Sequence, residues 1–274
     1  MQIELDGKLL LVGAGNMGLA LLSGWIARGL PASQVIVQDP SPPPAALEFL
    51  GKHGIVSKAA VEPSSTPIAV VLMAVKPQIM ADVLPGIAGH VGPKTVVLSI
   101  AAGKTIASFE RALPAGAAVV RAMPNTPASV GRGITVAVPN AHVTPAQRAA
   151  CEGLLAAVGE VAWTSAEGDL DAVTGVSGSG PAYVFYLAEC MTAAGIAQGL
   201  SPDLAQKLAR WTVAGAGELL HRSPLGADTL RQNVTSPNGT TYAALQVLMA
   251  EDGMRPLLVK AIEAATRRSR ELAS

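Results

Sequence analysis

The chain is poor in charge and in aromatic side chains, and neither sign of charge is in excess. Charged residues make up 15% of its 274 residues, and Lys plus Arg balance Asp plus Glu at 20 each. A typical soluble domain is roughly 25% charged. Zero net charge gives no electrostatic reason to bind nucleic acid or an anionic membrane, so we expect neither as a partner. We also expect so sparsely charged a chain to cover part of its surface in an oligomer.

Cysteine and histidine are also scarce. Cys151 and Cys190 are far from each other in sequence and far from the four histidines, so they form neither a zinc-binding spacing nor a disulfide framework. We expect two reduced thiols that fill the core. None of the histidines lies in a motif described below, and the sequence therefore predicts no metal site.

Glycine, by contrast, is abundant, and three of the 28 glycines form a motif near the start. Residues 9–20 read LLLVGAGNMGLA, which predicts a buried strand, a tight turn and the start of a helix. Gly13, Gly15 and Gly18 match the G-x-G-x-x-G pattern of dinucleotide-binding folds. That pattern needs glycine for the turn, for the approach of a pyrophosphate and for close helix packing. The helix N-terminus then faces the phosphates.

A different reading of the same segment is a membrane span or signal peptide, because residues 9–27 carry no charge. The three glycines and Asn16 in its middle oppose a span. Glu4 and Asp6 stand where a signal peptide would have basic residues. We therefore expect a soluble cytoplasmic protein.

The end of the second predicted strand bears on cofactor choice. Residues 34–38 (QVIVQ) lead into Asp39, about twenty residues past the glycine turn, where an acidic side chain binds the ribose 2′-hydroxyl of NAD. No Lys or Arg lies between Arg28 and Lys52, so a 2′-phosphate would lack a cation in this segment. A plain turn over residues 39–42 is the alternative.

Further strands are predicted over residues 68–75, 95–100, 118–123, 134–138 and 160–163. Ligands of open α/β sheets bind at the carboxyl ends of the strands, which places Lys76 near cofactor or substrate unless it is simply a solvated lysine. The small residues Ala101, Ala102 and Gly103 would let a flat ligand approach the backbone. The rigid loop 124–127 carries the amide of Asn125.

Two domains follow from this alternation of strands and helices. Residues 1–164 predict a parallel, doubly wound Rossmann-type α/β domain, and residues 165–274 an all-helical domain without strands. A polar turn over 177–181 leads into a predicted helix, 182–197, that is apolar nearly all round and so should be buried on every side. The segment 235–241, dense in hydroxyls at a helix N-terminus, suits a carboxylate, or else ordinary capping.

Together these motifs resemble the Δ1-pyrroline-5-carboxylate reductase family along nearly the whole chain. The matching segments are GAGNMG at 13–18, AVKP at 74–77, SIAAG at 99–103, MPNTP at 123–127, AVTGVSGSGPAY at 172–183 and VTSPNGTT at 234–241. The resemblance implies reduction of 1-pyrroline-5-carboxylate to L-proline, the last step of proline biosynthesis, with NADPH or NADH as hydride donor. It also implies a homodimer formed by the helical domains, of the kind that assembles into larger rings.

The resemblance assigns roles to individual residues. With Asp39 and Asn125, the expected cofactor-binding residues are Gly13, Ala14, Gly15, Asn16, Met17, Gly18, Ala74, Val75, Lys76, Pro77, Ala101, Ala102 and Gly103. The expected substrate-binding residues are Ser179, Ser236, Asn238, Gly239, Thr240 and Thr241, and the expected catalytic residues are Thr241 and Lys76. The chain departs from the family at Asn238, where Gly is common, and at Asp39, which disfavours a preference for NADPH.

Reduction of a protonated cyclic imine needs orientation of two rings and a hydrogen-bond partner for the nitrogen, and the hydroxyl of Thr241 can serve. The alternatives are a β-hydroxyacid dehydrogenase, an imine reductase or a non-enzymatic NAD(P)-binding redox sensor. The dehydrogenases normally carry a catalytic lysine in the helical domain, whereas Lys207 and Lys260 lie outside any polar motif. A sensor has no need of a carboxylate site.

Overall fold

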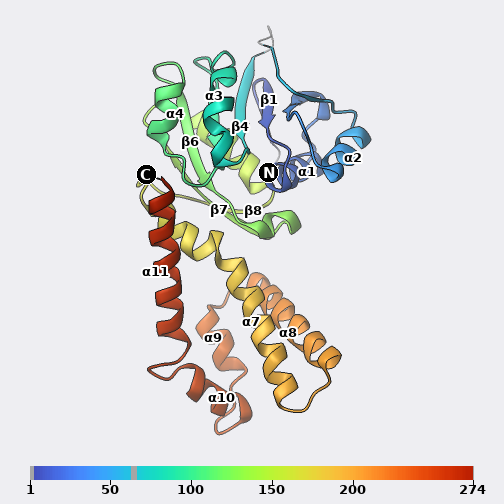
Figure 1. The fold of residues 1–274 in the computed structure, drawn as a ribbon, viewed down its shortest axis with the longest axis vertical. Coiled ribbons are helices and arrows are strands. Elements are labelled where there is room, and N and C mark those ends of the chain that lie inside the picture. Colours follow the sequence, from blue (N-terminus) through green and yellow to red (C-terminus); the bar gives the residue numbers. More distant parts are fainter. Residues whose placement is uncertain (1–2, 63–66, 274) are drawn as a thin grey trace. The chain divides into compact units, whose positions relative to one another are not determined.

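The computed structural model describes residues 3–62 and 67–273. It divides into two compact units, Met1–Gly178 with Thr266–Ser274, and Ser179–Ala265. We call them the sheet unit and the helical unit (Figure 1). Among the described helices, none is both long enough and apolar enough to cross a membrane.

In the described part of the sheet unit, one sheet holds eight strands in the order β3-β2-β1-β4-β5-β6-β7-β8. The strands are β1 (Lys8–Val12), β2 (Val35–Gln38), β3 (Ser57–Lys58), β4 (Ile68–Met73), β5 (Val96–Ser99), β6 (Ala118–Met123), β7 (Gly133–Pro139) and β8 (Gly159–Trp163). Every pairing from β3 through β6 is parallel. Strands β2 and β3 are added on one side of β1, and strands β4 to β6 on the other. This arrangement confirms the doubly wound, Rossmann-type sheet predicted from the sequence.

The last two strands depart from the predicted parallel arrangement. β7 runs antiparallel to β6, with Arg121 opposite Val138, and β8 runs parallel to β7. The connection from Met123 to Gly133 holds only the short 3-10 turn Thr126–Val130. A parallel crossover needs about a dozen residues or more, so this connection can only bring the chain back antiparallel.

Helices cover both faces of the sheet, and the side chains of β1 point alternately into the two cores that result. Leu9 and Leu11 belong to one buried cluster, and Leu10 and Val12 to the other. The first cluster includes side chains of α1 (Asn16–Ala27), α2 (Pro44–Lys52) and α5 (Pro145–Ala156), and the second those of α3 (Met80–Ala88) and α4 (Ile106–Ala112). A strand buried on both faces needs the unbroken apolar run seen in its sequence.

The helical unit contains α7 (Gly180–Ala197), α8 (Pro202–Arg222), α9 (Ala227–Asn233), α10 (Thr240–Leu248) and most of α11 (Met254–Ala273). The predicted all-helical character is confirmed. α7 and α8 approach closely, since a Cβ on Gly195 would lie 3.2 Å from that of Ala205. The predicted burial of α7 on every side is wrong for a single chain, in which Phe185 and Tyr186 are both 65% exposed.

The predicted polar turn over 177–181 is also wrong. After α6 (Asp169–Val173) the chain continues as a π-helical segment, Thr174–Gly178, into α7. The Thr174 hydroxyl donates to the Leu170 carbonyl (2.7 Å) and the Ser177 hydroxyl to the Val173 carbonyl (3.0 Å). Each hydroxyl bonds to the carbonyl four residues earlier, a contact that occurs inside helices and often bends them.

Candidate active site

The glycine turn has the geometry of a phosphate cradle. Gly13 has φ +96°, and a Cβ there would lie 2.9 Å from the Ala74 carbonyl oxygen; a Cβ on Gly18 would lie 2.2 Å from the Gly13 carbonyl oxygen. A Cβ on Gly15 would meet nothing within 4 Å. Gly15 is the N-cap of α1 and no side chain caps that helix. The first N–H groups of α1, beginning with Asn16, therefore face open space in which an anionic group fits.

Asp39 lies against this turn. Its Oδ2 accepts a hydrogen bond from the Ala14 N–H and its Oδ1 one from the Ser41 N–H, both at 2.8 Å. The carboxylate thus ties the end of β2 to the glycine turn and puts negative charge beside it.

A cation missed in the sequence lies on the neighbouring strand. The Asp39 N–H donates to the carbonyl of Lys58, the exposed last residue of β3, at 2.9 Å. The pairing of β2 with β3 brings Lys58 to this edge. Lys58 lies outside the segment from Arg28 to Lys52, so the absence of cations within that segment does not apply to it.

A cavity of about 250 Å³ lies at the carboxyl ends of β4, β5 and β6. It is lined by Met17, Ala74, Val75, Ile100, Ala102, Met123, Pro124, Asn125, Thr126 and Gly178. The Asn125 Oδ1 accepts from the Ile134 N–H at 2.9 Å, which leaves the NH₂ group as a donor. A cavity of about 580 Å³ opens at the other end of the sheet, where Ala69 and Val96 begin their strands. Because ligands of parallel sheets bind at the carboxyl ends, the smaller cavity is the candidate site.

Other predicted cofactor residues flank the cavity. Lys76 is exposed and precedes the 3-10 turn Pro77–Ile79, which Pro77 begins. Ala101 is buried and its N–H donates to the Ser99 hydroxyl at 3.3 Å. Gly103 has φ +72°, a conformation that favours glycine.

In the helical unit, five of the predicted substrate residues lie on the loop before α10 and in the first turn of that helix. Asn238 has φ +58°, and the Gly239 N–H donates to the Ser236 carbonyl at 3.0 Å. Gly239 is the N-cap of α10 and no side chain caps the helix. Thr240 is exposed and Thr241 half-buried, so two hydroxyls accompany the first N–H groups of the helix. Such an end suits a carboxylate. Ser179, half-buried, stands on a different element, directly before α7.

Comparisons with known proteins agree with this arrangement. A family model described as pyrroline-5-carboxylate reductase dimerisation matches residues 167–272, and one described as NADP oxidoreductase, coenzyme F420-dependent, matches residues 8–103. A pyrroline-5-carboxylate reductase from Pseudomonas aeruginosa is 41% identical over 269 residues, which cover 97% of each chain. The chain belongs to the pyrroline-5-carboxylate reductase family. A Synechocystis member is 39% identical over 97% of this chain and 98% of its own.

Solved structures of pyrroline-5-carboxylate reductases extend the match to the fold. The one from Coxiella burnetii has a TM-score of 0.90 and 34% identity, and it covers 98% of this chain and 99% of its own. The one from Plasmodium falciparum, determined with NADP bound, has a TM-score of 0.77 and 28% identity over 98% of this chain and 99% of its own. The family predicted from the motifs is therefore confirmed.

The cavity brings together predicted residues that follow separate strands or begin α1: Met17, Ala74, Val75, Ala102 and Asn125. The sequence assigned no cofactor role to the other lining residues, although two of them belong to the rigid loop 124–127; they are Ile100, Met123, Pro124, Thr126 and Gly178. Each of them falls inside a family motif, so the motifs themselves were the available signal.

The cysteines lie outside the reductase site. Cys151 is buried, and burial raises the pKa of its thiol to about 12, so it is protonated near neutral pH. Cys190 is exposed, and the prediction that it fills the core is wrong for a single chain. A side-chain hydrogen bond with Cys190 raises the pKa of Tyr186 on the same helix. Within the described residues, no group of three or more His, Cys, Asp or Glu side chains could hold a metal ion.

Proposed function

We propose that the chain acts as its family name describes and reduces 1-pyrroline-5-carboxylate to L-proline with NADPH or NADH. The observation that carries the proposal is the pairing of two features in one chain of this family. These are the open cradle at Gly15 and the uncapped start of α10 with its hydroxyls. The first fits a dinucleotide and the second fits the carboxylate of a small substrate.

The residues of the sheet unit would hold the cofactor. The turn from Gly13 to Gly18 takes the pyrophosphate at the start of α1, Asp39 takes the adenosine ribose, and Ala74, Val75 and Pro77 line the approach to the ring. Ala101, Ala102 and Gly103 follow β5, and Asn125 offers its NH₂ donors. The bound cofactor supplies the hydride.

The residues of the helical unit would hold the substrate. The carboxylate binds to the first N–H groups of α10 and to the hydroxyls of Ser236 and Thr240. Asn238 and Gly239 shape the loop, and Ser179 contributes its hydroxyl. Thr241 accepts a hydrogen bond from the protonated ring nitrogen, whose proton comes from solution. Lys76, which follows the carboxyl end of β4, contributes a positive charge on the cofactor side. What the chain contributes is orientation and hydrogen bonding rather than a proton-transfer base.

The alternative activities have less support. Lys207 lies beside Leu204, Leu208, Trp211 and Thr212 on α8, and it is outside any polar motif of the kind that holds a dehydrogenase lysine. A non-enzymatic sensor does not account for the carboxylate-binding loop.

Two further proposals concern assembly and location. We propose that the helical domain, residues 165–274, joins two chains into a homodimer, that such dimers form a ring, and that residues 1–164 form the cofactor domain. We also propose that the enzyme works in the cytoplasm.

The direct test follows NADH and NADPH oxidation with 1-pyrroline-5-carboxylate while proline is quantified by mass spectrometry. The expected result is one proline formed for each dinucleotide oxidised. Cofactor binding without turnover would favour the sensor instead.

A further inference from the structure

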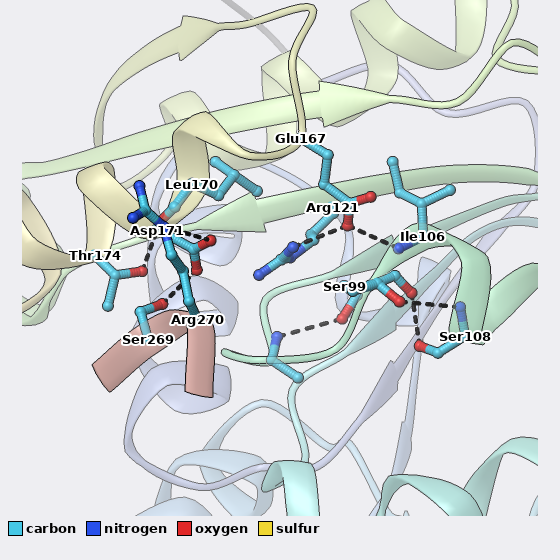
Figure 2. Close-up of polar contacts among 12 residues, drawn as sticks. Ser99, Ile106, Ser108, Arg121, Glu167, Leu170, Asp171, Thr174, Ser269 and Arg270 are labelled. Carbon is cyan, nitrogen blue, oxygen red and sulfur yellow. Dashed lines mark hydrogen bonds and ion pairs between the residues drawn. The ribbon is translucent and has the colours of Figure 1, made fainter. Parts of the chain in front are cut away.

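Both passages of the chain between the two units lead into a polar region of the sheet unit, in which Figure 2 shows two separate groups of contacts, one at Glu167 and one at Asp171. The two groups comprise Arg121, Glu167, Asp171, Ser269 and Arg270, and we call them together the junction cluster. One passage leaves the sheet unit after α6 and the segment Thr174–Gly178; the other returns at Thr266 within α11. The loop 101–105, between β5 and α4, lies beside the cluster.

Glu167 fixes one end of that loop. Its Oε1 accepts a hydrogen bond from the Arg121 guanidinium and another from the Ile106 N–H, each at 2.8 Å. Arg121 is only 6% exposed and is paired in register with Ser99, the last residue of β5. Ile106 begins α4 directly after the loop. Glu167 thus ties the far end of the loop to the sheet, through a buried charge that needs its partner.

Asp171, on the short helix α6 that follows Glu167 in the chain, holds the last turn of α11. Its Oδ1 accepts from the Ser269 hydroxyl at 2.7 Å, and its Oδ2 lies 4.0 Å from the Arg270 Nε. The Ser269 residue is 8% exposed. The end of α11 is therefore fixed to the sheet unit by a partly buried side-chain contact, as Figure 2 shows for Ser269 and Asp171.

The turn that Asp171 holds also meets the loop. A Cβ on Gly103 would lie 3.1 Å from the Leu272 carbonyl oxygen and 3.8 Å from the Leu272 Cβ. Gly103 also has φ +72°, so both its backbone conformation and its neighbour favour glycine. The loop is thus fixed by Glu167 at its far end and backed by the end of α11 at Gly103.

We propose that the last turn of α11, held by Asp171 and Ser269, positions the loop Ala101–Gly103 for NAD(P)H. Asp171 and Ser269 are positioning residues that act through the loop and do not touch the cofactor. This inference rests on the proposed function, because it takes the loop to be part of the cofactor site.

The test is a double-mutant cycle on the contact between Gly103 and Leu272. Gly103→Ala, removal of residues 272–274, and the two changes together are compared by the NADH Kd from nicotinamide fluorescence. We expect each single change to raise the Kd by about three- to tenfold, and the double change to raise it by clearly less than the product of the two. The added methyl group no longer meets the Leu272 carbonyl once that residue is removed.

The second test separates positioning from plain stability. Asp171→Ala and Ser269→Ala should raise the Kd and KM for NADH by similar factors, whereas Asp171→Asn, which keeps an acceptor for the Ser269 hydroxyl, should restore most of the affinity. The KM for 1-pyrroline-5-carboxylate should stay within about twofold. Arg268→Ala is the matched control, since it removes only an exposed pair with Glu271 on the same turn.

One result would overturn the inference, and the Gly103→Ala variant then shows whether the proposed cofactor site stands. If Asp171→Ala and the truncation lower the unfolding temperature but leave the NADH Kd unchanged, the cluster is only structural. If Gly103→Ala alone weakens NADH binding, the inference fails while the cofactor site stands. If Gly103→Ala also leaves the Kd unchanged, the loop is not part of that site and both fail.

Discussion

Asp39 brings a full negative charge to the edge of the glycine turn, where it accepts from the Ala14 N–H at 2.8 Å. A 2′-phosphate would approach this carboxylate, while a 2′-hydroxyl could donate to it. We therefore expect kcat/KM with NADH to be at least equal to that with NADPH. Asp39→Ser keeps an acceptor for the Ala14 N–H but removes the charge, and should shift the ratio toward NADPH by about tenfold.

The positive charge of Lys58 could favour a 2′-phosphate and so oppose the effect of Asp39. Its carbonyl accepts from the Asp39 N–H, so its backbone lies at the same edge. Steady-state rates with NADH and NADPH are measured for wild type, Asp39→Ser and Lys58→Met. They show whether the negative charge of Asp39 or the positive charge of Lys58 sets the cofactor preference. A wild-type enzyme that strongly prefers NADPH, and loses that preference in Lys58→Met, would mean that the lysine outweighs the aspartate.

Cys151 makes the unfolding free energy depend on pH above about pH 9. Burial raises the pKa of its thiol from 9.0 to about 12, so above pH 9 the unfolded state loses this proton before the folded state does. The stabilisation is complete below pH 9 and is lost as the pH rises toward 12. From pH 9 to 10, wild type should lose about 1 kcal/mol more unfolding free energy than Cys151→Ala. Urea unfolding of both proteins measures this, and parallel pH profiles would contradict it.

At the scale of single elements, the start of α10 carries the sharpest prediction. Thr241→Val keeps the shape and β-branching but removes the hydroxyl, which should cost about 1 to 3 kcal/mol in transition-state binding. That is a loss of roughly 5- to 150-fold in kcat/KM. The NADH Kd should not change, because the cofactor is held by the other unit. Wild-type rates in Thr241→Val would remove the residue from the mechanism, and a parallel loss of cofactor affinity would reassign it.

The loop before α10 depends on the backbone of Asn238. At φ +58° a residue other than Gly, Asn or Asp is strained. Asn238→Ala should therefore lower the unfolding free energy by about 1 kcal/mol and raise the KM for the substrate, while Asn238→Gly, the common family residue, should be nearly neutral. Urea unfolding and steady-state kinetics measure the two effects. Equal effects of the two substitutions would mean that the amide group, and not the backbone angle, sets the loop.

Elements whose own residues determine them could be predicted from the sequence. The apolar runs of β1 and β4 must be buried on both faces, and Thr144 with Gln147 forms the capping box that begins α5. The antiparallel direction of β7 follows from the short connection after β6, and the pattern of strands and helices did not show it. The position of Lys58 near Asp39 follows from the pairing of β3 with β2, which joins residues far apart in the sequence. The return of α11 to the sheet unit depends on contacts such as Ser269 with Asp171, which no periodic pattern records.

At the scale of the whole molecule, the helical unit leaves large apolar side chains uncovered. Phe185 on α7 is 65% exposed and Trp211 on α8 is 69% exposed. Several large apolar side chains exposed on one unit are typical of an interface. We expect wild type to sediment as a dimer or larger at about micromolar concentration, and Phe185→Lys to weaken the association by 2 kcal/mol or more, roughly 30-fold in Kd.

Leu47→Lys provides the matched control for this prediction. Leu47 is 53% exposed on α2 of the sheet unit, so the same substitution there should leave sedimentation and activity unchanged. An active wild-type monomer at low concentration would contradict the proposed dimer.

The return of residues 266–272 to the sheet unit also sets an order in time. A ribosome delivers the glycine turn first and the end of α11 last, and domains fold as they emerge. The sheet unit is therefore the first part of the chain to begin folding. Its Gly103 loop gains the Leu272 backing only after the whole helical unit has been synthesised. A nascent chain that lacks its last few residues would carry a nearly complete Rossmann sheet with an unfinished nucleotide edge.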